Sequence, residues 1–373
     1  MRRRMMTTVV TLGLLVAGTW FAVSQVDAGS TQRPPVTSYL ATWRGALVQH
    51  GRVVHLTGFN AYGATTWWPV NWGCGRPVDD VDAMFTSLRP GSMVRTWAFQ
   101  ALAWNNKQTP QHLDFFALDR VVRAAERHHQ LLDLVLSDQA GTCDDGHWHD
   151  KAWYDGGFRA RHPDDGRGLG KLAYWDWVTA VVHRYRDSPA VAMWEPVNEP
   201  EASDCHGGCD GAHRSCPAGA ATSLRRFFDT VGGRIHALDP HVLVGTGTLA
   251  GGECGLAGDG FVTVGGSSAV NVLSVHDYGA EDTALPAGVK SRIDQAKGLR
   301  KPLVVGEAGL TGGVGSCRSR VQRAALAAAK ARATLTGGGS AWLPWWYSEQ
   351  PSSCGDDFGP KDPVLASLWS APL

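Results

Sequence analysis

The stretch AVAMWEPVNEP, residues 190–200, sets the expectation for the whole fold. Its first half is an apolar run that predicts a buried β-strand, and its second half places Asn198 and Glu199 on a loop that Pro200 stiffens. A second apolar strand, in KPLVVGEAG at residues 301–309, ends at Glu307 between two glycines. Two strands that each end in a carboxyl group predict a site at the rim of a sheet.

Eight short apolar runs recur along the chain, at 53–59, 93–98, 131–136, 191–197, 242–246, 272–275, 303–306 and 341–345. Helical patterns separate them, at 78–88, 114–129, 172–186, 223–238, 287–299, 321–335 and 363–369, and the link 250–268 is only weakly helical. Eight parallel strands with helical crossovers predict an α/β fold, a single (β/α)8 barrel. An open doubly wound sheet is the alternative, but no glycine-rich phosphate turn follows the first strand.

The first 28 residues read as a secretory signal peptide. Three arginines precede an apolar run from Val9 to Val23, and a small-residue site ends at Ala28. We expect cleavage after Ala28, a short leader at 29–37, one catalytic domain at 38–373, and a secreted protein. The alternative is an uncleaved membrane anchor, because residues 7–23 approach the length of a spanning helix. No later segment predicts a membrane span.

Charge and cysteine content limit the possible partners. The 35 basic and 35 acidic residues become 32 and 34 once residues 1–28 are removed, so neither nucleic acid nor an anionic membrane surface is expected. We expect a monomer. Eight cysteines, an even number, predict disulfides in an oxidising compartment.

Two of the disulfide pairings are predicted from loop positions. Cys74 with Cys143 would tie the first loop to the third, and Cys317 with Cys354 the seventh to the eighth. The pairing among the other four stays open: Cys205, Cys209, Cys216 and Cys254. Metal binding by Cys205, Cys209 and Cys216 is a weaker alternative, since no zinc-type spacing repeats. No metal and no other cofactor is expected.

In a barrel, reactive residues occupy the carboxyl ends of the strands. Polar and aromatic side chains gather at those predicted ends: Asn60, Arg95, Asp138, Asn198, Glu199, His276, Tyr278, Glu307 and Trp345. We predict that Glu199 is a general acid and base, with a pKa raised by nearby negative charge and partial burial. Glu307 is the predicted nucleophile, kept ionised by Arg95 and Tyr278. Glu195 is the weaker acid candidate, since a position inside the strand favours a hydrogen bond within the barrel.

Other residues have competing interpretations. His276 and Tyr278 share one face of a strand, so Asp277 is assigned a structural role. The histidine-rich segment 147–150 could suggest a metal, but a solvated or substrate-lining loop is favoured. Three of the sixteen tryptophans lie in the first loop and are candidate walls for sugar subsites or packing residues: Trp67, Trp68 and Trp72.

These motifs resemble glycoside hydrolase family 5, within a clan of retaining (β/α)8 glycosidases. The similarity lies in GFN at 58–60, WEPVNEP at 194–200, VHDY at 275–278 and GE at 306–307, and RTWAF at 95–99 is similar to endo-β-mannanases. The resemblance implies that Asn198 contacts the 2-hydroxyl of the sugar being cleaved and that Trp345 is the platform beneath it. Several aromatics follow the eighth strand, so Trp346 is an alternative platform. The loop 138–158 lacks the Asn-Asn-Trp that mannanases often carry.

We therefore predict a secreted retaining β-glycosidase that hydrolyses a neutral polymer, a β-1,4-mannan or β-1,4-glucan, with mannan favoured by residues 95–99. The substrate-binding residues would be Arg95, Asn198, His276, Tyr278 and Trp345, beside the catalytic pair Glu199 and Glu307. Two alternatives remain: an exo-acting glycosidase or transglycosylase, and a non-catalytic carbohydrate-binding barrel.

Overall fold

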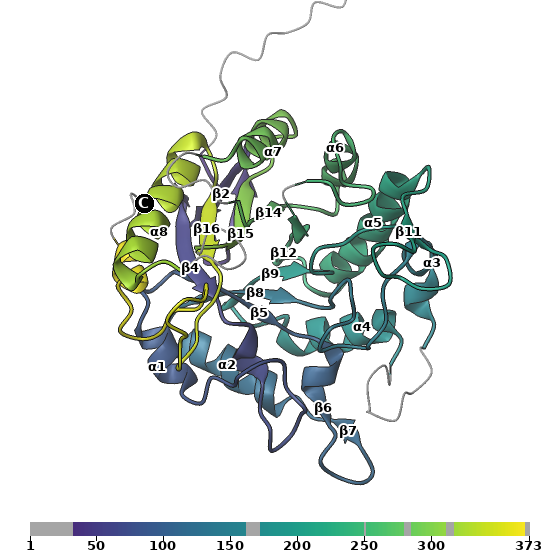
Figure 1. The fold of residues 1–373 in the computed structure, drawn as a ribbon, viewed down its shortest axis with the longest axis horizontal. Coiled ribbons are helices and arrows are strands. Elements are labelled where there is room, and N and C mark those ends of the chain that lie inside the picture. Colours follow the sequence, from purple (N-terminus) through teal and green to yellow (C-terminus); the bar gives the residue numbers. More distant parts are fainter. Residues whose placement is uncertain (1–32, 162–171, 250, 280–284, 311–316, 370–373) are drawn as a thin grey trace, which may run out of the picture. The chain divides into compact units, whose positions relative to one another are not determined.

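A computed structural model of the chain describes residues 33–161, 172–249, 251–279, 285–310 and 317–369. Residues 34–373 form one compact unit. Within it, parallel strands make a ring that helices surround (Figure 1). No helix in this described part of the chain is long and apolar enough to cross a membrane. The predicted signal peptide at 1–28 lies outside the described residues.

The ring is a (β/α)8 barrel, as predicted, and its strands follow one another in the order of the sequence. The barrel strands are β4 (Leu56–Asn60), β5 (Met93–Trp97), β8 (Leu131–Val135), β9 (Val191–Glu195), β12 (Leu243–Val244) with β13 (Thr248–Leu249), β14 (Leu273–Asp277), β15 (Leu303–Ala308) and β16 (Ala341–Pro344). The helices are α1 (Val81–Thr86), α2 (Phe116–Arg127), α3 (Lys151–Tyr154), α4 (Tyr174–Tyr185), α5 (Ala220–Leu238), α6 (Gly260–Gly265), α7 (Ala287–Gly298), α8 (Arg320–Gly337) and α9 (Pro363–Trp369). Four further two-residue strands form small hairpins: β6 (Trp104–Asn105), β7 (His112–Leu113), β10 (Asp204–Cys205) and β11 (Arg214–Ser215).

The fifth barrel strand is interrupted. Its first half, β12, pairs with β9, and its second half, β13, pairs with β14. Between them Gly245 bridges to Val272, and Gly247 has a positive φ of 62° that favours glycine. The predicted strand at 242–246 is therefore present, but the ring closes through two short ladders instead of one.

The first predicted strand begins too early. Arg52 and Val53 pair with β2 in a small antiparallel sheet of β1 (Ala41–Trp43), β2 (Ala46–Gln49) and β3 (Arg52–Val53), and the barrel strand starts at Leu56. Val53 is half exposed, whereas every residue of β4 is buried. The chain turns between residues 53 and 56, which a continuous apolar run cannot reveal.

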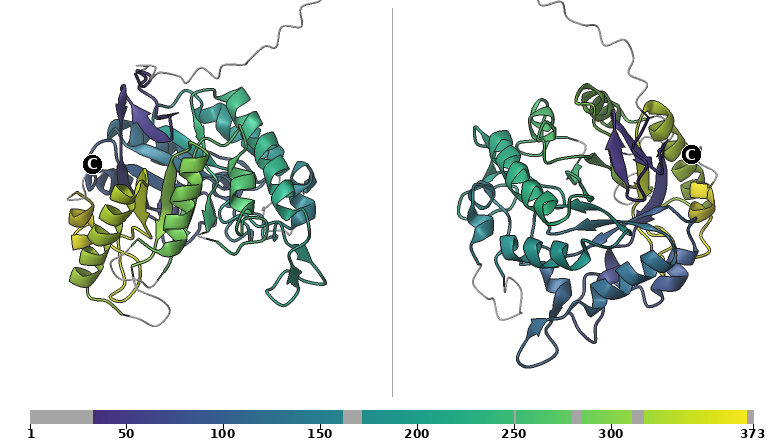
Figure 2. Two further views of the ribbon diagram at one scale, coloured as in Figure 1. Left: turned by 90° about the horizontal axis from the view of Figure 1, so that it is seen from above. Right: turned by 180° about the vertical axis from the view of Figure 1, so that it is seen from behind.

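This hairpin closes the end of the barrel opposite the predicted site. Leu40 and Leu47 join one buried cluster with residues from the starts of the strands: Leu56, Met93, Leu131, Met193, Leu243, Val272, Val304 and Ala341. In the left view of Figure 2, the purple hairpin and the teal β10–β11 hairpin lie at opposite ends of the ring. The carboxyl ends of the strands are thus the open face.

All eight cysteines are paired. The predicted disulfides Cys74–Cys143 and Cys317–Cys354 are confirmed, and the remaining pairs are Cys205–Cys209 and Cys216–Cys254. Every cysteine lies in a segment that follows a barrel strand, so the bridges brace loops at the carboxyl ends. The alternative of a cysteine metal site is wrong, because no thiolate is left to bind one.

Replacing Leu47 by Ala should lower the free energy of unfolding by about 2–4 kcal/mol, because the side chain is fully buried and its removal leaves a cavity. Urea denaturation at fixed pH measures the change. Val53→Ala, in the neighbouring strand and half exposed, is the control and should change stability by about 0.5 kcal/mol or less. Equal losses in the two variants would mean that the hairpin does not seal the barrel.

Candidate active site

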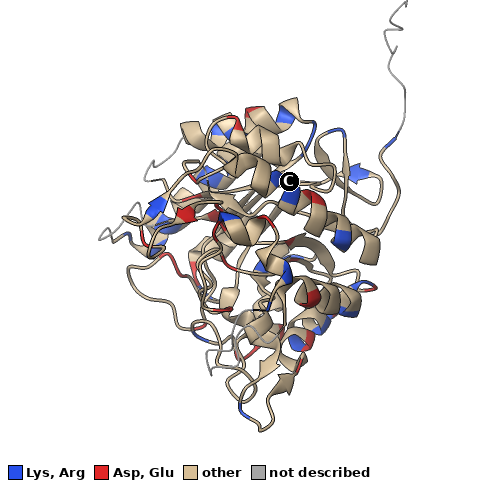
Figure 3. Cartoon of the chain, turned by 90° about the vertical axis from the view of Figure 1, so that its right-hand side faces the viewer, with Lys and Arg blue, Asp and Glu red and all other residues tan. Residues whose placement is uncertain are grey.

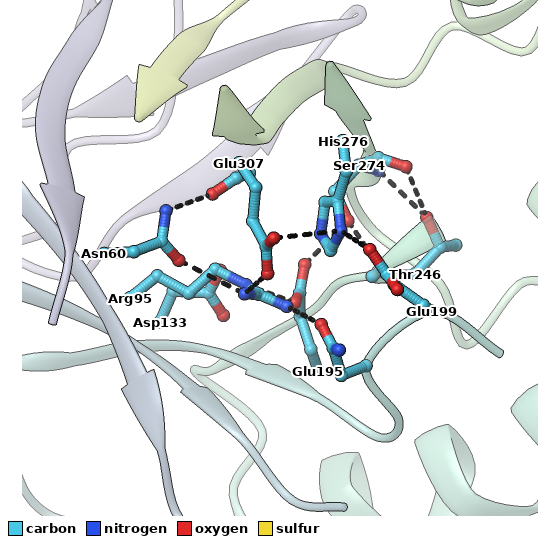
Figure 4. A network of polar contacts seen from close by, with 12 residues as sticks. Asn60, Arg95, Asp133, Glu195, Glu199, Thr246, Ser274, His276 and Glu307 are labelled. Carbon is cyan, nitrogen blue, oxygen red and sulfur yellow. Dashed lines mark hydrogen bonds and ion pairs between the residues drawn. The ribbon is translucent and has the colours of Figure 1, made fainter. Parts of the chain in front are cut away.

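The side chains predicted for the site converge at the carboxyl ends of six strands, and Figure 4 shows the polar network among them. Asn60 ends β4, Arg95 lies in β5, Asn198 and Glu199 follow β9, His276 lies in β14 with Tyr278 just after it, and Glu307 lies in β15. Trp345 follows β16 directly. The structure therefore brings together the predicted catalytic pair and the five predicted substrate-binding residues.

Arg95 is the centre of the polar network. Its Nη1 donates to Glu307 Oε1 at 2.5 Å and to Asn60 Oδ1 at 3.2 Å, and its Nη2 donates to Asn198 Oδ1 at 2.8 Å. Its Nε donates to Glu195 Oε2 at 2.8 Å. Burial alone would lower the pKa of the guanidinium, but the charges of Glu195 and Glu307 outweigh burial and raise it. Arg95 thus stays positively charged, and its charge offsets that of the acids around it.

Both oxygens of Glu307 accept hydrogen bonds. Arg95 donates to one, and the hydroxyl of Tyr278 donates to the other. Burial, and then the charge of Glu307, raise the pKa of Tyr278, so the phenol keeps its proton and remains a donor. Gly309 makes room for this ring, since a Cβ at that position would lie 2.8 Å from Tyr278 Cδ1. Glu307 is consequently fixed in one orientation.

Glu199 sits on a strained turn beyond β9. Its φ is +51°, and its backbone N–H donates to the carbonyl of Gly247 at 2.7 Å. Its Oε1 lies 2.8 Å from Nδ1 of His276, and the same nitrogen lies 3.5 Å from Glu307 Oε2. The interrupted fifth strand, which contains Gly247, therefore helps to aim Glu199 at the ring of His276.

The predicted pKa shift of Glu199 is wrong in sign. Burial raises the pKa of this carboxyl, but the hydrogen bond and charge of His276, followed by the charge of Arg95, bring it below its ordinary value. The prediction counted the neighbouring acids and missed His276 and Arg95. These two residues favour the carboxylate form of Glu199.

One oxygen or nitrogen from each of Glu199, His276 and Glu307 lies within 4.8 Å of the others, a spacing that could hold a metal ion. It is the one such group found among the described residues. Arg95 already binds Glu307, and His276 directs its Nδ1 at Glu199. A metal would have to compete with this buried arginine, so the donor set suits carboxyl chemistry better than metal binding.

The pair opens into a cleft of about 600 Å3. Beyond Glu199 and Glu307, its walls include Tyr62, Trp97, Phe99, Asp138, Asn198, Leu249, Tyr278 and Trp345. Trp345 stacks on Tyr62, with ring centroids 5.1 Å apart. Trp346 instead lines a neighbouring cavity of about 530 Å3, which Tyr62 also borders. Glu195 is fully buried beneath the cleft, between Arg95 and the hydroxyl of Ser274.

Two further residues support the site, and the sequence pointed to one of them. Asp138, which the sequence placed at a strand end, accepts from the Asn198 amide at 3.0 Å and so fixes which way that amide points. Lys330, buried in α8, binds Asp277 Oδ2 at 3.1 Å and the carbonyls of Gly279 and Gly309 at 3.1 and 3.4 Å. It ties together the segments that follow Tyr278 and Glu307. A lysine in a helix carries no local signal of this contact, whereas Asp138 at a strand end does.

The structure bears on two loop interpretations and corrects the first of them. His149 is buried and stacks on Trp153 with centroids 3.7 Å apart, so segment 147–150 is a packed brace at this residue and not a solvated loop. Trp67 packs against Phe116, as the packing alternative expected. Trp68 and Trp72 are exposed and are not among the residues that line the cleft.

Paired carboxyl groups at the ends of the fourth and seventh strands of a (β/α)8 barrel define a site of the glycoside hydrolase type. The comparisons with known proteins agree with this class. No family model matches the chain. Mannan endo-1,4-β-mannosidase 8 of Oryza sativa subsp. japonica is 26% identical over 275 residues, covering 59% of this chain and 66% of the rice protein. A putative mannan endo-1,4-β-mannosidase 5 from the same plant is 28% identical over 364 residues, 81% of this chain and 68% of its own length. The chain thus spans about two thirds of these curated relatives.

Solved structures show the same fold. The endo-1,4-β-mannanase of Rhizomucor miehei superposes with a TM-score of 0.64 at 18% identity, covering 89% of this chain and 97% of that one. A glycoside hydrolase family 5 mannosidase from Rhizomucor miehei gives a TM-score of 0.58 at 14% identity, with 90% and 97% covered. The resemblance to family 5 endo-β-mannanases that the sequence predicted is confirmed.

The lowered pKa of Glu199 makes a prediction for stability. A carboxyl whose folded-state pKa lies below its ordinary value of 4.5 stabilises the fold at higher pH, and this contribution is lost as pH falls through the folded-state pKa. The unfolding free energy of the wild type should therefore fall relative to Glu199→Gln between about pH 5 and pH 3. Urea denaturation of both proteins across this range measures the difference, and a pH-independent difference would contradict the assignment.

Proposed function

We propose that the chain is a retaining endo-β-mannanase that cleaves by double displacement. The observation that carries the proposal is the close approach of Glu199 and Glu307, which have carboxylate oxygens within 4.8 Å of each other. Retaining glycosidases place their two carboxyl groups about 5–5.5 Å apart, whereas inverting enzymes leave about 6.5–9.5 Å for a water molecule.

In this mechanism Glu307 is the nucleophile. Its oxygens are oriented by Arg95 and Tyr278, so little reorganisation precedes attack on the anomeric carbon. As the glycosyl ester forms, the negative charge on Glu307 disappears, and the two donors that stabilised that charge also assist its return when the ester is hydrolysed. Arg95 and Tyr278 thus act on the nucleophile as well as on the substrate.

Glu199 is the acid and base. It must carry a proton when the glycosidic bond breaks, yet His276 and Arg95 hold its pKa below the ordinary value. A sugar that fills the cleft expels water from around Glu199, and this desolvation favours the neutral form of its carboxyl group. Glu199, with its Oε1 held 2.8 Å from Nδ1 of His276, then delivers its proton to the leaving oxygen.

The remaining residues position the sugar. Asn198, with its amide oriented by Asp138 and Arg95, is placed to contact the 2-hydroxyl of the sugar being cleaved. Trp345 is the platform, and its place in the wall of the cleft with Glu199 and Glu307 favours it over Trp346. Ring stacking on Tyr62 holds it there.

Mannan is the proposed substrate because the relatives at 26–28% identity are named mannan endo-1,4-β-mannosidases. A neutral polymer also agrees with the charge distribution, since acidic and basic residues are interspersed along the chain in Figure 3. Endo action is favoured because the catalytic cleft and the adjoining cavity share Tyr62 as a wall. The two spaces together leave room for more than one sugar.

The setting of the enzyme is part of the proposal. Four disulfides suit an oxidising compartment, which supports secretion after removal of residues 1–28 and a catalytic domain at 38–373. We propose that it acts as a monomer and without a cofactor.

Glu307→Gln should lower the rate on mannan roughly a thousandfold or more, because the amide cannot form the glycosyl ester. A reducing-end assay on mannan, glucomannan, carboxymethylcellulose and mixed-linkage glucan measures both the loss and the preference. Glu126→Gln, on the outer helix α2, is the control and should keep full activity. Wild-type activity on glucans with none on mannan would overturn the substrate, and an active Glu307→Gln would overturn the mechanism.

The first product should keep the β-configuration at its new reducing end. Two displacements at one carbon restore the original stereochemistry, whereas a single attack by water inverts it. Proton NMR of the anomeric signals in the first minutes of hydrolysis, before mutarotation, distinguishes the two. An initial α-anomer would show that Glu307 activates water instead of attacking carbon.

A further inference from the structure

Two tryptophans of the first loop are turned toward solvent. Trp68 and Trp72 are each 57% exposed, while Trp177, Trp194 and Trp342 are fully buried. Neither exposed indole lines the catalytic cleft. Two large apolar side chains on one short loop are costly to leave in water, and such an exposed patch commonly marks a binding surface.

The loop that carries them is rigidly built. Asn71 is fully buried, and its side-chain amide donates to the carbonyls of Thr65 and Leu102 at 3.0 and 2.7 Å, while its oxygen accepts from the N–H of Trp67. At the end of the loop, Thr66 and Cys74 exchange two hydrogen bonds. The exposure of the indoles is therefore imposed by buried contacts and is not a feature of a loose loop.

Trp72 is oriented by the neighbouring β6–β7 hairpin, which projects from the ring in Figure 1. The side-chain amide of Asn106 is satisfied at both ends in one orientation. In that orientation its nitrogen donates to the carbonyl of Val70 at 3.2 Å, and its oxygen accepts from Trp72 Nε1 at 2.9 Å. The ammonium of Lys107 lies 3.5 Å from the centroid of the indole, over one of its faces. The edge and one face are thus fixed, and the indole remains more than half exposed.

Trp67 is the foundation of the patch. Its ring packs against Phe116 with centroids 6.0 Å apart, and the guanidinium of Arg120 lies 4.3 Å from its centroid. Arg120 in turn donates to the carbonyls of Ala64 and Val78 on either side of the loop. Trp67 therefore supports the loop by packing, and Trp68 and Trp72 are the tryptophans that form its exposed surface.

The patch is continuous with the cleft through the backbone. Gly73 has a φ of +76°, and a Cβ there would lie 2.4 Å from Thr66 Cγ2 and 3.2 Å from Trp68 Nε1, so Trp68 packs against the backbone at this glycine. The next residue, Cys74, lines the cleft and is tied to Cys143. Trp68 therefore packs beside the residue that precedes the cleft wall at Cys74.

We propose that Trp68 and Trp72 form a second carbohydrate-binding surface, outside the cleft, for a β-linked polysaccharide chain. The inference rests on the proposed function, because a polymer substrate extends beyond any cleft that cuts it. Indole faces stack on the apolar faces of sugar rings, and Lys107 places hydrogen-bond donors beside one of them for hydroxyl groups. The surface holds the polymer near the cleft without taking part in the cleavage.

The test separates this surface from the cleft. Trp68→Ala/Trp72→Ala is made in the full chain, both alone and in the Glu307→Gln background, where binding can be measured without hydrolysis. Depletion isotherms on insoluble mannan give the affinity, and kcat/KM on a soluble mannooligosaccharide reports the cleft. Trp43→Ala, a partly exposed indole under Arg44 on the hairpin at the other end of the barrel, is the matched control.

We expect the double variant to lose about tenfold in affinity for insoluble mannan and to keep kcat/KM on the oligosaccharide within twofold, with Trp43→Ala unchanged in both. Undiminished binding to the polymer would overturn the surface. A parallel loss on the oligosaccharide would place the indoles in the cleft and also overturn it. Loss of a concentration-dependent dimer in sedimentation, with polymer binding intact, would assign the patch to a second copy of the chain.

The parent protein distinguishes failure of this inference from failure of the proposed function. A wild type that does not hydrolyse mannan but binds a polysaccharide through Trp68 and Trp72 refutes the mannanase assignment and keeps the surface. A wild type that hydrolyses mannan, with variants that bind it equally well, refutes the surface alone.

Discussion

A single buried cation organises the reactive end of this barrel. The guanidinium of Arg95 uses its three nitrogens to bind groups from three other strands or their ends, among them Glu195 and Glu307. Without it, these acids would face one another in a site that excludes water, at a cost of several kcal/mol. The position of Glu307 is therefore a property of the whole ring, because each partner of Arg95 fixes one strand relative to the others.

More acidic side chains surround Arg95 than its single positive charge can balance. Asp133 lies 3.8 Å from the arginine, is completely buried, and neither of its oxygens has a hydrogen-bond partner within the described structure. Burial, and then the charge of Glu195, raise the pKa of Asp133 well above its ordinary value. These surroundings favour the neutral form of Asp133, and the hydrogen bonds that Arg95 donates to acids go to Glu195 and Glu307.

Much of the fold follows from patterns that are local in sequence. Each barrel strand is short and mostly apolar, and most have a polar side chain at or just beyond their ends, so the number of strands, their order and the residues at those ends could be inferred directly. The interruption between β12 and β13 could not, because side chains replace the ladder there. Gly247 donates its N–H to Ser274 Oγ, and Ser274 donates its own N–H to Thr246 Oγ1. Such substitutions depend on three-dimensional neighbours that no spacing rule encodes.

The site shows the same division. Residues at strand ends were identifiable because the barrel forces them together, but the sign of the pKa shift on Glu199 depended on the single ring of His276 lying 2.8 Å away. Likewise, the sequence could count the tryptophans of the first loop but could not tell which one Phe116 would cover.

The disulfides all join loops, and none crosses the ring of strands. Reduction would leave the strands and the hydrogen bonds of Arg95 unchanged while releasing the loops around them, so exposure to thiols should loosen the walls of the cleft before it unfolds the barrel.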